Sequence, residues 1–386
     1  MQAPLKGQGF LGFTQAEVER YSRQLVLPEI GPKGQRRLKD SSALVVGAGG
    51  LGIPASVYLA AAGVGRVGIV DDDVIEKSNL HRQVIYSESD VGKPKAQVAS
   101  TYLSKVNPHV TVEPCQVKLS SANAMELLGK YDVVVDCTDN FPARYLINDA
   151  CVLLHKPDVY ASIFRFDGQA SVFDGRRGPC YRCLFPEPPP AESVQDCAVA
   201  GVLGVLPGIM GGIQAAQTID ILVENGKSLV GRLLLFNAMD MTFNELRVRR
   251  NENCPACGPS PTIKKLIDYE EFCGSWRPSK SMEEITPKAL ERLLDSKSKV
   301  VLLDVRERHE YDLCHIGGAK LVPLPELRGR LNELEKDDDL VVYCHVGVRS
   351  GRAVELLTSA GFKKVRNLAG GIRAWADEVD RTMPLY

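Results

Sequence analysis

Apolar and polar residues alternate along the chain in blocks that predict strands and helices in turn. Residues 43–46 form a short apolar run typical of a buried parallel strand, and 53–62 have helical periodicity. Similar apolar runs follow at 67–70 and 131–136. Because strands that alternate with helices form doubly wound sheets, we expect an α/β fold. Further predicted elements are a helix from Thr14, a helix after 92–95, a strand near 111–117, strands within 155–173 with Gly168 at their turn, a helix within 201–222 and a strand at 233–236.

Three glycines separate the first strand from its helix, at Gly47, Gly49 and Gly52. This G-x-G-x-x-G spacing predicts a turn whose N–H groups and positive helix end face a phosphate. Asp71 ends the next strand, about 20 residues later, where such folds hold a ribose hydroxyl. Taken alone, these residues favour NAD or FAD over ATP.

Three cations and one acid change this interpretation. Arg23, Arg82 and Lys95 supply charges that a triphosphate needs and a nicotinamide does not. Asp139 follows the 131–136 strand, where a carboxylate can hold Mg²⁺ on phosphate oxygens. Each cation alone could be a solvated surface residue, and Asp139 alone could cap a helix. Together, near the carboxyl ends of separate strands, these residues favour ATP with Mg²⁺.

Two C-x-x-C pairs stand out among the eleven cysteines, Cys180/Cys183 and Cys254/Cys257. Four thiolates close a tetrahedral zinc shell, so we expect a structural Zn²⁺ that joins distant segments. The alternative is one redox C-x-x-C beside an accidental second pair.

A second, smaller α/β unit is predicted over 284–386, after a polar linker at 274–283. Its apolar run at 340–343 leads directly into Cys344, and a helix begins near Ser350. A turn of this kind favours an anionic, reactive thiol. The alternative is a buried cysteine at a strand end, although we expect this turn to suit packing poorly.

Composition excludes two classes of partner. The 386 residues are 44% apolar and carry a net charge of −1, so no overall field attracts nucleic acid or an anionic membrane. No apolar run reaches the length of a membrane span, and no signal-peptide pattern opens the chain. We therefore expect a cytoplasmic protein.

The motifs of residues 14–273 resemble the ubiquitin-activating-type adenylyltransferases, in particular the molybdopterin-synthase adenylyltransferase and ThiF group. The resemblance is carried by residues 47–52, 71, 78–83, 92–95 and 137–140 and by both cysteine pairs. It implies a homodimer in which Arg23 reaches the phosphates of the neighbouring subunit. It also implies that ATP is surrounded by Gly50, Asp71, Ser78, Asn79, Leu80, His81, Arg82, Lys95, Asp139 and Asn140.

The stretch from Cys344 to Arg349, with residues 304–306 and 370–375, resembles a rhodanese domain in which Cys344 carries a persulfide. A Cys-x5-Arg phosphatase would need one more residue before Arg349, which could either be a charge partner in the loop or be exposed. The whole chain resembles the adenylyltransferase–sulfurtransferase fusions. In these the cysteine at the position of Cys197 can form a thioester or disulfide with the carrier; it could also be an ordinary buried thiol.

The expected function is adenylylation of the C-terminal glycine of a ubiquitin-like sulfur carrier ending in Gly-Gly, followed by sulfur transfer from Cys344. Two other classes remain open, an NAD-dependent oxidoreductase and a non-catalytic module that docks carriers. The sulfur donor is also open, between thiosulfate and a cysteine desulfurase. So is the pathway, among molybdenum cofactor, thiamine, thiolated tRNA and cysteine synthesis.

Overall fold

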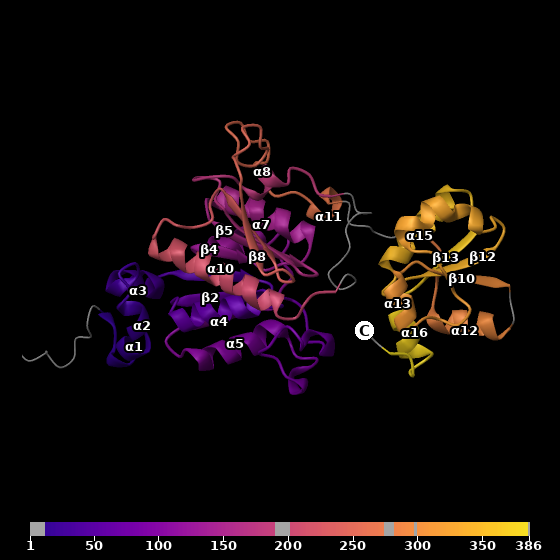
Figure 1. Ribbon diagram of the computed structural model, residues 1–386, viewed down its shortest axis with the longest axis horizontal. Helices are drawn as coiled ribbons and strands as arrows, with labels where there is room; N and C mark the ends of the chain where they lie inside the picture. Colours follow the sequence, from indigo (N-terminus) through magenta and orange to yellow (C-terminus); the bar gives the residue numbers. More distant parts are fainter. Residues whose placement is uncertain (1–11, 190–200, 274–281, 297–298, 385–386) are drawn as a thin grey trace, which may run out of the picture. The chain divides into compact units, whose positions relative to one another are not determined.

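The computed structural model describes residues 12–189, 201–273, 282–296 and 299–384. The chain divides into two compact units, with a boundary after Cys273 (Figure 1). Each unit has its own sheet and its own buried cores. Among the described residues, no helix is both long and apolar enough to span a bilayer.

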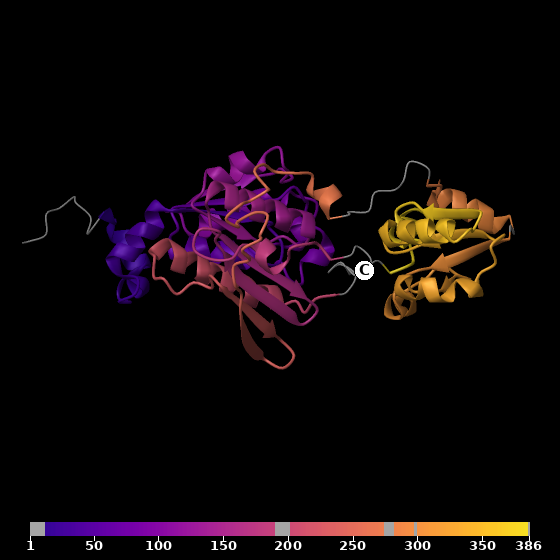
Figure 2. The same ribbon diagram turned by 90° about the horizontal axis from the view of Figure 1, so that it is seen from above.

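The first unit contains an eight-stranded sheet in the order β3-β2-β1-β4-β5-β6-β7-β8. Pairing is parallel from β3 to β5 and antiparallel from β5 to β8. Figure 2 shows the β7–β8 hairpin, in orange-brown, at one side of the sheet. The strands are β1 (Ser42–Val46), β2 (Arg66–Val70), β3 (Thr111–Cys115), β4 (Val133–Asp136), β5 (Asp158–Phe164), β6 (Asp167–Phe173), β7 (Arg232–Asn237) and β8 (Thr242–Arg247).

Helices cover both faces of this sheet, which confirms the predicted doubly wound α/β fold. Successive strand residues face opposite sides, so Val45 joins a core with α3, α4, α5 and α10, while Leu44 joins one with α6, α7 and α11. Figure 1 shows α4, α5 and α10 on one side and α7 on the other. The helices are α1 (Gln15–Arg20), α2 (Ser22–Leu25), α3 (Gly31–Asp40), η2 (Lys77–Asn79), η3 (Glu88–Asp90), α4 (Gly52–Ala62), α5 (Lys95–Val106), α6 (Ala124–Gly129), α7 (Phe141–Leu154), α8 (Tyr181–Leu184), α10 (Leu206–Val223) and α11 (Tyr269–Phe272).

The prediction that Gly168 lies at a turn is wrong. Gly168 lies inside β6, and the turn between β5 and β6 includes Arg165, which has a φ of 54°. A Cβ atom at Gly168 would come within 2.5 Å of the Met210 sulfur on α10. The glycine therefore leaves room for the Met210 side chain of α10 to pack against β6.

The helix predicted from Thr14, which was expected to contain residues 20–24, begins as expected but is shorter. The Thr14 hydroxyl accepts from Glu17 N–H, and the Glu17 carboxylate accepts from Thr14 N–H, which completes a capping box. This helix ends at Arg20, and the residues that follow form the separate helix α2. The helix predicted within 201–222 begins at Leu206.

The second unit contains five parallel strands in the order β11-β10-β12-β13-β9. Thr286 caps the first helix and Pro287 opens it. The elements are β9 (Glu284–Ile285), α12 (Pro287–Asp295), β10 (Val300–Asp304), α13 (Arg308–Leu313), β11 (Lys320–Leu321), α14 (Leu324–Leu327), η5 (Arg328–Glu333), β12 (Asp339–Tyr343), α15 (Val348–Ser359), β13 (Lys364–Leu368) and α16 (Gly371–Glu378).

Candidate functional site

The glycine turn after β1 packs directly on the backbone of neighbouring segments. Gly47 has a φ of +99°, and a Cβ atom there would lie 2.8 Å from the carbonyl oxygen of Cys137. A Cβ atom on Gly52 would lie 1.7 Å from the carbonyl oxygen of Gly47. Only glycine allows both this backbone conformation and this approach, so the turn lies against the end of β4.

Asp71, at the end of β2, is fixed to the same turn. Its carboxylate accepts from Ala48 N–H at 2.6 Å and from Asp73 N–H at 2.9 Å. Burial raises the pKa of Asp71 above its ordinary value, outweighing the opposing charge of Lys95 and these hydrogen bonds. A carboxylate held at the edge of the turn can accept a hydrogen bond from a ribose hydroxyl.

Arg82 also lies at the glycine turn. A Cβ atom on Gly50 would lie 3.6 Å from Arg82 Cγ, and 3.0 Å from Pro207 at the start of α10. The Arg82 guanidinium donates to the carbonyl of Ser78 at 2.8 Å and lies 2.9 Å from His81 Nε2. Burial, and then the charge of Arg82, lower the pKa of His81, so the imidazole is a neutral acceptor.

The other residues predicted around ATP in this segment stabilise its turn. Asn79 is buried, and its side-chain oxygen accepts from Glu76 N–H at 3.0 Å. The Ser78 hydroxyl donates to the Glu76 carboxylate at 3.4 Å, and Leu80 packs against the core. These contacts fix the conformation of the segment that contains Arg82.

Lys95 has a partner that sequence reasoning missed. Its buried ammonium group lies 2.8 Å from the exposed carboxylate of Asp73. The Lys95 backbone N–H also donates to the Asp73 carbonyl at 3.0 Å. Asp73 lies two residues after Asp71, so this ion pair places the Lys95 cation beside the end of β2.

The turn after β4 contains Asp139 and Asn140. Asn140 is the N-cap of α7, because its side-chain oxygen accepts from Ala143 N–H at 3.0 Å. The alternative that Asp139 is the cap is therefore wrong, and its carboxylate is exposed. Beneath it, one oxygen of buried Asp136 accepts from both the N–H and the hydroxyl of Thr138, at 2.9 and 2.6 Å. These two hydrogen bonds between Thr138 and Asp136 were not predicted from the sequence.

The close contacts of Gly47 and Gly50 thus bring the ends of β1 and β4 together with Arg82. The hydrogen bond from Ala48 N–H holds Asp71 at the same turn. Arg23 is not part of this group, since it lies exposed on α2, and no hydrogen bond or ion pair joins it to the turn within the described residues. Cys197 lies outside the described residues.

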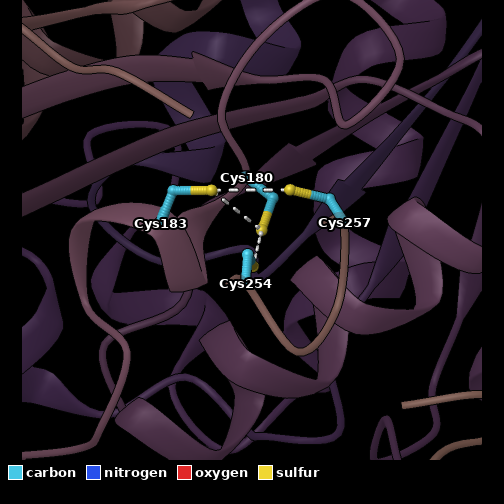
Figure 3. Close-up of side chains that lie close together, drawn as sticks. All are labelled: Cys180, Cys183, Cys254 and Cys257. Atoms are coloured by element: carbon cyan, nitrogen blue, oxygen red, sulfur yellow. Dashed lines mark hydrogen bonds between the residues drawn. The ribbon is translucent and has the colours of Figure 1, made fainter. Parts of the chain in front are cut away.

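The four cysteines of the two C-x-x-C pairs meet in one cluster (Figure 3). Their sulfur atoms approach at 3.9 Å for Cys180–Cys183, 3.5 Å for Cys180–Cys254 and 3.4 Å for Cys183–Cys257. Four thiolates around one zinc ion would lie roughly 3.8 Å apart, given Zn–S bonds of roughly 2.3 Å. Since all four are unoxidised and three are buried, the donor set fits a closed zinc site better than a redox pair.

Cys344 follows β12 and lies inside a loop that closes around its sulfur. Gly347, with a φ of +96°, is the N-cap of α15, and its N–H donates to Cys344 Sγ at 3.1 Å. Cys344 is only 1% exposed and belongs to a hydrophobic core, so the expectation that a thiol packs poorly here is wrong. The sulfur is both buried and hydrogen-bonded by the backbone.

Arg349 is a charge partner within this loop. Its guanidinium donates two hydrogen bonds of 2.7 Å to the carboxylate of buried Glu310 on α13. Burial favours a raised pKa for Glu310, but the hydrogen bonds and charge of Arg349 outweigh it, so the pKa of Glu310 is lowered. The buried Asp304–Arg306 pair lies at the end of β10, where β10 pairs with β12. Sequence reasoning missed Glu310, which lies 39 residues before Arg349.

Comparison with known proteins assigns both units to families. The model of the ThiF family matches residues 21–256, and the model of the rhodanese-like domain matches residues 286–378. The chain therefore belongs to the ThiF family and contains a C-terminal rhodanese-like domain, as the motifs predict.

Its relatives include proteins whose names combine two activities and which it matches over nearly their whole length. The chain is 43% identical to "Adenylyltransferase and sulfurtransferase MOCS3" of Culex quinquefasciatus, over 96% of this chain and 90% of that protein. It is 44% identical to "Probable adenylyltransferase/sulfurtransferase MoeZ" of Mycobacterium tuberculosis, over 96% and 95%. "Sulfur carrier protein adenylyltransferase" of Thermus thermophilus is 56% identical and matches 68% of this chain and 98% of that protein. Escherichia coli MccB with ATP shares the fold, with a TM-score of 0.55 and 23% identity, over 62% of this chain and 74% of that one.

Proposed function

We propose that this protein adenylylates the C-terminal glycine of a ubiquitin-like sulfur carrier and then transfers sulfur to it from Cys344. The observation that supports this most directly is the pairing, in one chain, of a glycine turn beside Asp71 and Arg82 with a loop that binds the sulfur of Cys344. The relatives of matching length have names that combine the same two activities. Nothing in their names supports an NAD-dependent oxidoreductase or a non-catalytic docking module.

In the first step, the carrier's carboxylate oxygen attacks the α-phosphorus of ATP, and pyrophosphate leaves with the electron pair of the broken P–O bond. The nucleophile is already ionised, so no protein base is needed. The turn N–H groups and Arg82 orient the phosphates, and Asp71 binds the ribose. Lys95 contributes charge once a phosphate replaces Asp73 as its partner.

The acids at the strand ends fit a magnesium ion. Exposed Asp139 and, after the end of β2, exposed Asp72 and Asp73 offer the carboxylate oxygens that Mg²⁺ prefers, while Asp71 is left to the ribose. When bound with ATP, Mg²⁺ neutralises phosphate charge. Zn²⁺ held by the four cysteines would join α8 to the segment after β8 and has a structural role only.

In the second step, the outer sulfur of a Cys344 persulfide attacks the acyl carbon of the adenylate, and AMP leaves. The resulting acyl disulfide is opened when a second thiolate attacks Cys344 Sγ, which releases the thiocarboxylate and leaves a disulfide on Cys344. Cys197 is a proposed source of that thiolate, or of a thioester with the carrier. Arg23 is proposed to act across a homodimer, on the phosphates of the other subunit.

The decisive experiment is ATP–pyrophosphate exchange with a carrier that ends in Gly-Gly. We expect exchange with the full carrier and none with a carrier that lacks its last glycine. Asp139→Asn should lower exchange by about a hundredfold, whereas Asp377→Asn, an exposed acid on α16, should not change it. Cys344→Ala should keep exchange but form no thiocarboxylate. Tight NAD binding without ATP binding would contradict the proposal.

A further inference from the structure

The Cys344 sulfur has a second polar neighbour that the proposed chemistry has not used. Ser350, on the first turn of α15, is fully buried, and its hydroxyl oxygen lies 3.3 Å from Cys344 Sγ. The same oxygen lies 2.6 Å from Oδ1 of buried Asn367 on β13. A serine has one hydroxyl hydrogen, so it cannot donate fully to both neighbours at once.

The orientation of the Asn367 amide decides which neighbour receives that hydrogen. Its Nδ2 donates to the Gly347 carbonyl at 3.2 Å and to the Glu284 carboxylate at 3.1 Å. Both of these partners can only accept, so the amide nitrogen must face them and Oδ1 must face Ser350. Because Oδ1 can only accept, Ser350 donates to Asn367 in this arrangement.

The Ser350 oxygen then presents a lone pair to Cys344. This suits a neutral thiol, whose S–H can donate to it, but it opposes a thiolate, which needs donors. A thiolate at Cys344 is favoured only if the Ser350 hydroxyl turns from Asn367 to the sulfur, where it joins the donor from Gly347 N–H.

We propose that Ser350 is a positioning residue whose single hydroxyl hydrogen moves between Asn367 and Cys344 Sγ as the charge on that sulfur changes. This inference rests on the proposed sulfur transfer. In charging, the Cys344 thiolate bonds to a donor's outer sulfur, and the donor's S–S bond breaks with its electron pair leaving on the donor. In discharge to a small nucleophile such as cyanide, which forms no acyl disulfide, the nucleophile bonds to the outer sulfur, the Sγ–S bond breaks, and the pair returns to Sγ. Ser350 stabilises Sγ as the leaving group.

The proposal predicts different effects on the two half-reactions. A donor to a sulfur makes it a better leaving group but a weaker nucleophile. Removing the Ser350 hydroxyl should therefore slow discharge without slowing the attack of a fully ionised Cys344. A merely structural defect would slow both.

The test uses the full chain and two variants, Ser350→Ala and the matched control Ser359→Ala, at the exposed end of the same helix. Inorganic polysulfide loads Cys344, and mass spectrometry measures the gain of one sulfur atom. Cyanide then discharges it, and thiocyanate is measured. Charging is compared on the alkaline plateau of each variant's own pH profile. There the neighbouring His345 is neutral, because burial lowers its pKa, and the Glu310–Arg349 pair is charged.

We expect Ser350→Ala to discharge about tenfold more slowly, the effect of one hydrogen bond to a charged group, with no loss in plateau charging. Ser359→Ala should match the unmodified protein in both. Discharge at the unmodified rate, or an equal fall in both half-reactions, would overturn the inference and leave the proposed function standing. If the unmodified protein never gains sulfur on Cys344, the proposed sulfur transfer itself fails.

Discussion

The glycine turn of the first unit and the Cys344 loop of the second occupy the same place in their folds, yet they are built in opposite ways. Each follows the carboxyl end of a parallel strand and precedes a helix. The first adjoins the turn after β4, where the Asp139 carboxylate is exposed, whereas the second buries its sulfur to 1% exposure beneath hydrogen bonds from its own loop. A large diffusing substrate needs open polar groups, whereas a single transferred atom can be enclosed.

One buried acid of the first unit lacks the kind of partner that the buried acids near Cys344 have. Near Cys344, buried Asp304 and Glu310 each face an arginine. In the first unit, buried Asp158 has no hydrogen-bond partner for either carboxylate oxygen within the described residues. The sulfur loop therefore rests on satisfied ion pairs, while the first sheet contains an acid whose burial is not compensated.

The largest expected effect is the loss of the first unit's activity alone when its metal is removed. Removal of zinc by a strong chelator should unfold or loosen the first unit, because a structural zinc site contributes folding free energy directly. ATP–pyrophosphate exchange should be lost, while thiocyanate formation at Cys344 continues. Metal analysis and both assays on one sample check this. Equal loss of the two activities would break the comparison, as would a protein that contains no zinc.

A smaller but still large effect is expected at the glycine turn. Gly52→Ala places a methyl group 1.7 Å from the Gly47 carbonyl oxygen, so the turn must open. The free energy of unfolding of the first unit should fall by about 3 kcal/mol, and ATP binding should be lost. Gly212→Ala, in open space on α10, is the matched control and should be neutral or stabilising. Urea denaturation measures both variants.

Beside the sulfur loop, Glu310→Gln should cost about 2 kcal/mol of stability, because Arg349 loses a buried ionic partner. The pKa of Glu310 is lowered on folding, so its stabilisation is present above the unfolded value near 4.5 and is lost as pH falls through the folded pKa. The free energies of unfolding of Glu310→Gln and of the unmodified protein should therefore converge at acid pH. Glu378→Gln, exposed on α16, is the control. A difference in their free energies of unfolding that does not change with pH would contradict the ion pair.

The smallest expected effect is a gain in stability. Burial, and then the charge of Asp136, raise the pKa of Asp158 well above 3.8. As pH rises past 3.8, the unfolded chain loses this proton before the folded chain does, so Asp158 lowers stability progressively with pH. Asp158→Asn should raise the free energy of unfolding at neutral pH by about 1 kcal/mol and flatten its pH dependence. Denaturation at acid and neutral pH tests this, and destabilisation at neutral pH would mean that Asp158 has a partner.

Local sequence was sufficient for the elements that position both sites. The runs at 43–46, 67–70 and 340–343 match β1, β2 and β12 to within a residue. Such runs are visible because parallel strands are buried on both faces. The spacing of the C-x-x-C pairs likewise predicted a cluster that the fold assembles across 74 positions.

The partners of the site residues could not be predicted in the same way. Glu310 meets Arg349, and Asn367 meets Ser350, only because α13, α15 and β13 pack in one particular register. Nothing at either residue marks its partner in the chain. The same limit explains the wrong prediction for Gly168, since a glycine against which a distant side chain packs looks in the sequence like a glycine in a turn.

The Lys95–Asp73 pair has a consequence for how the first unit meets its nucleotide. The cation is already neutralised before any phosphate arrives, so a phosphate that engages it exchanges one anion for another. Long-range attraction gains little from such an exchange, and added salt weakens the resident contact as well as the incoming one. Nucleotide affinity should therefore vary only shallowly with ionic strength, and selectivity should come from the fit of the phosphates to the turn.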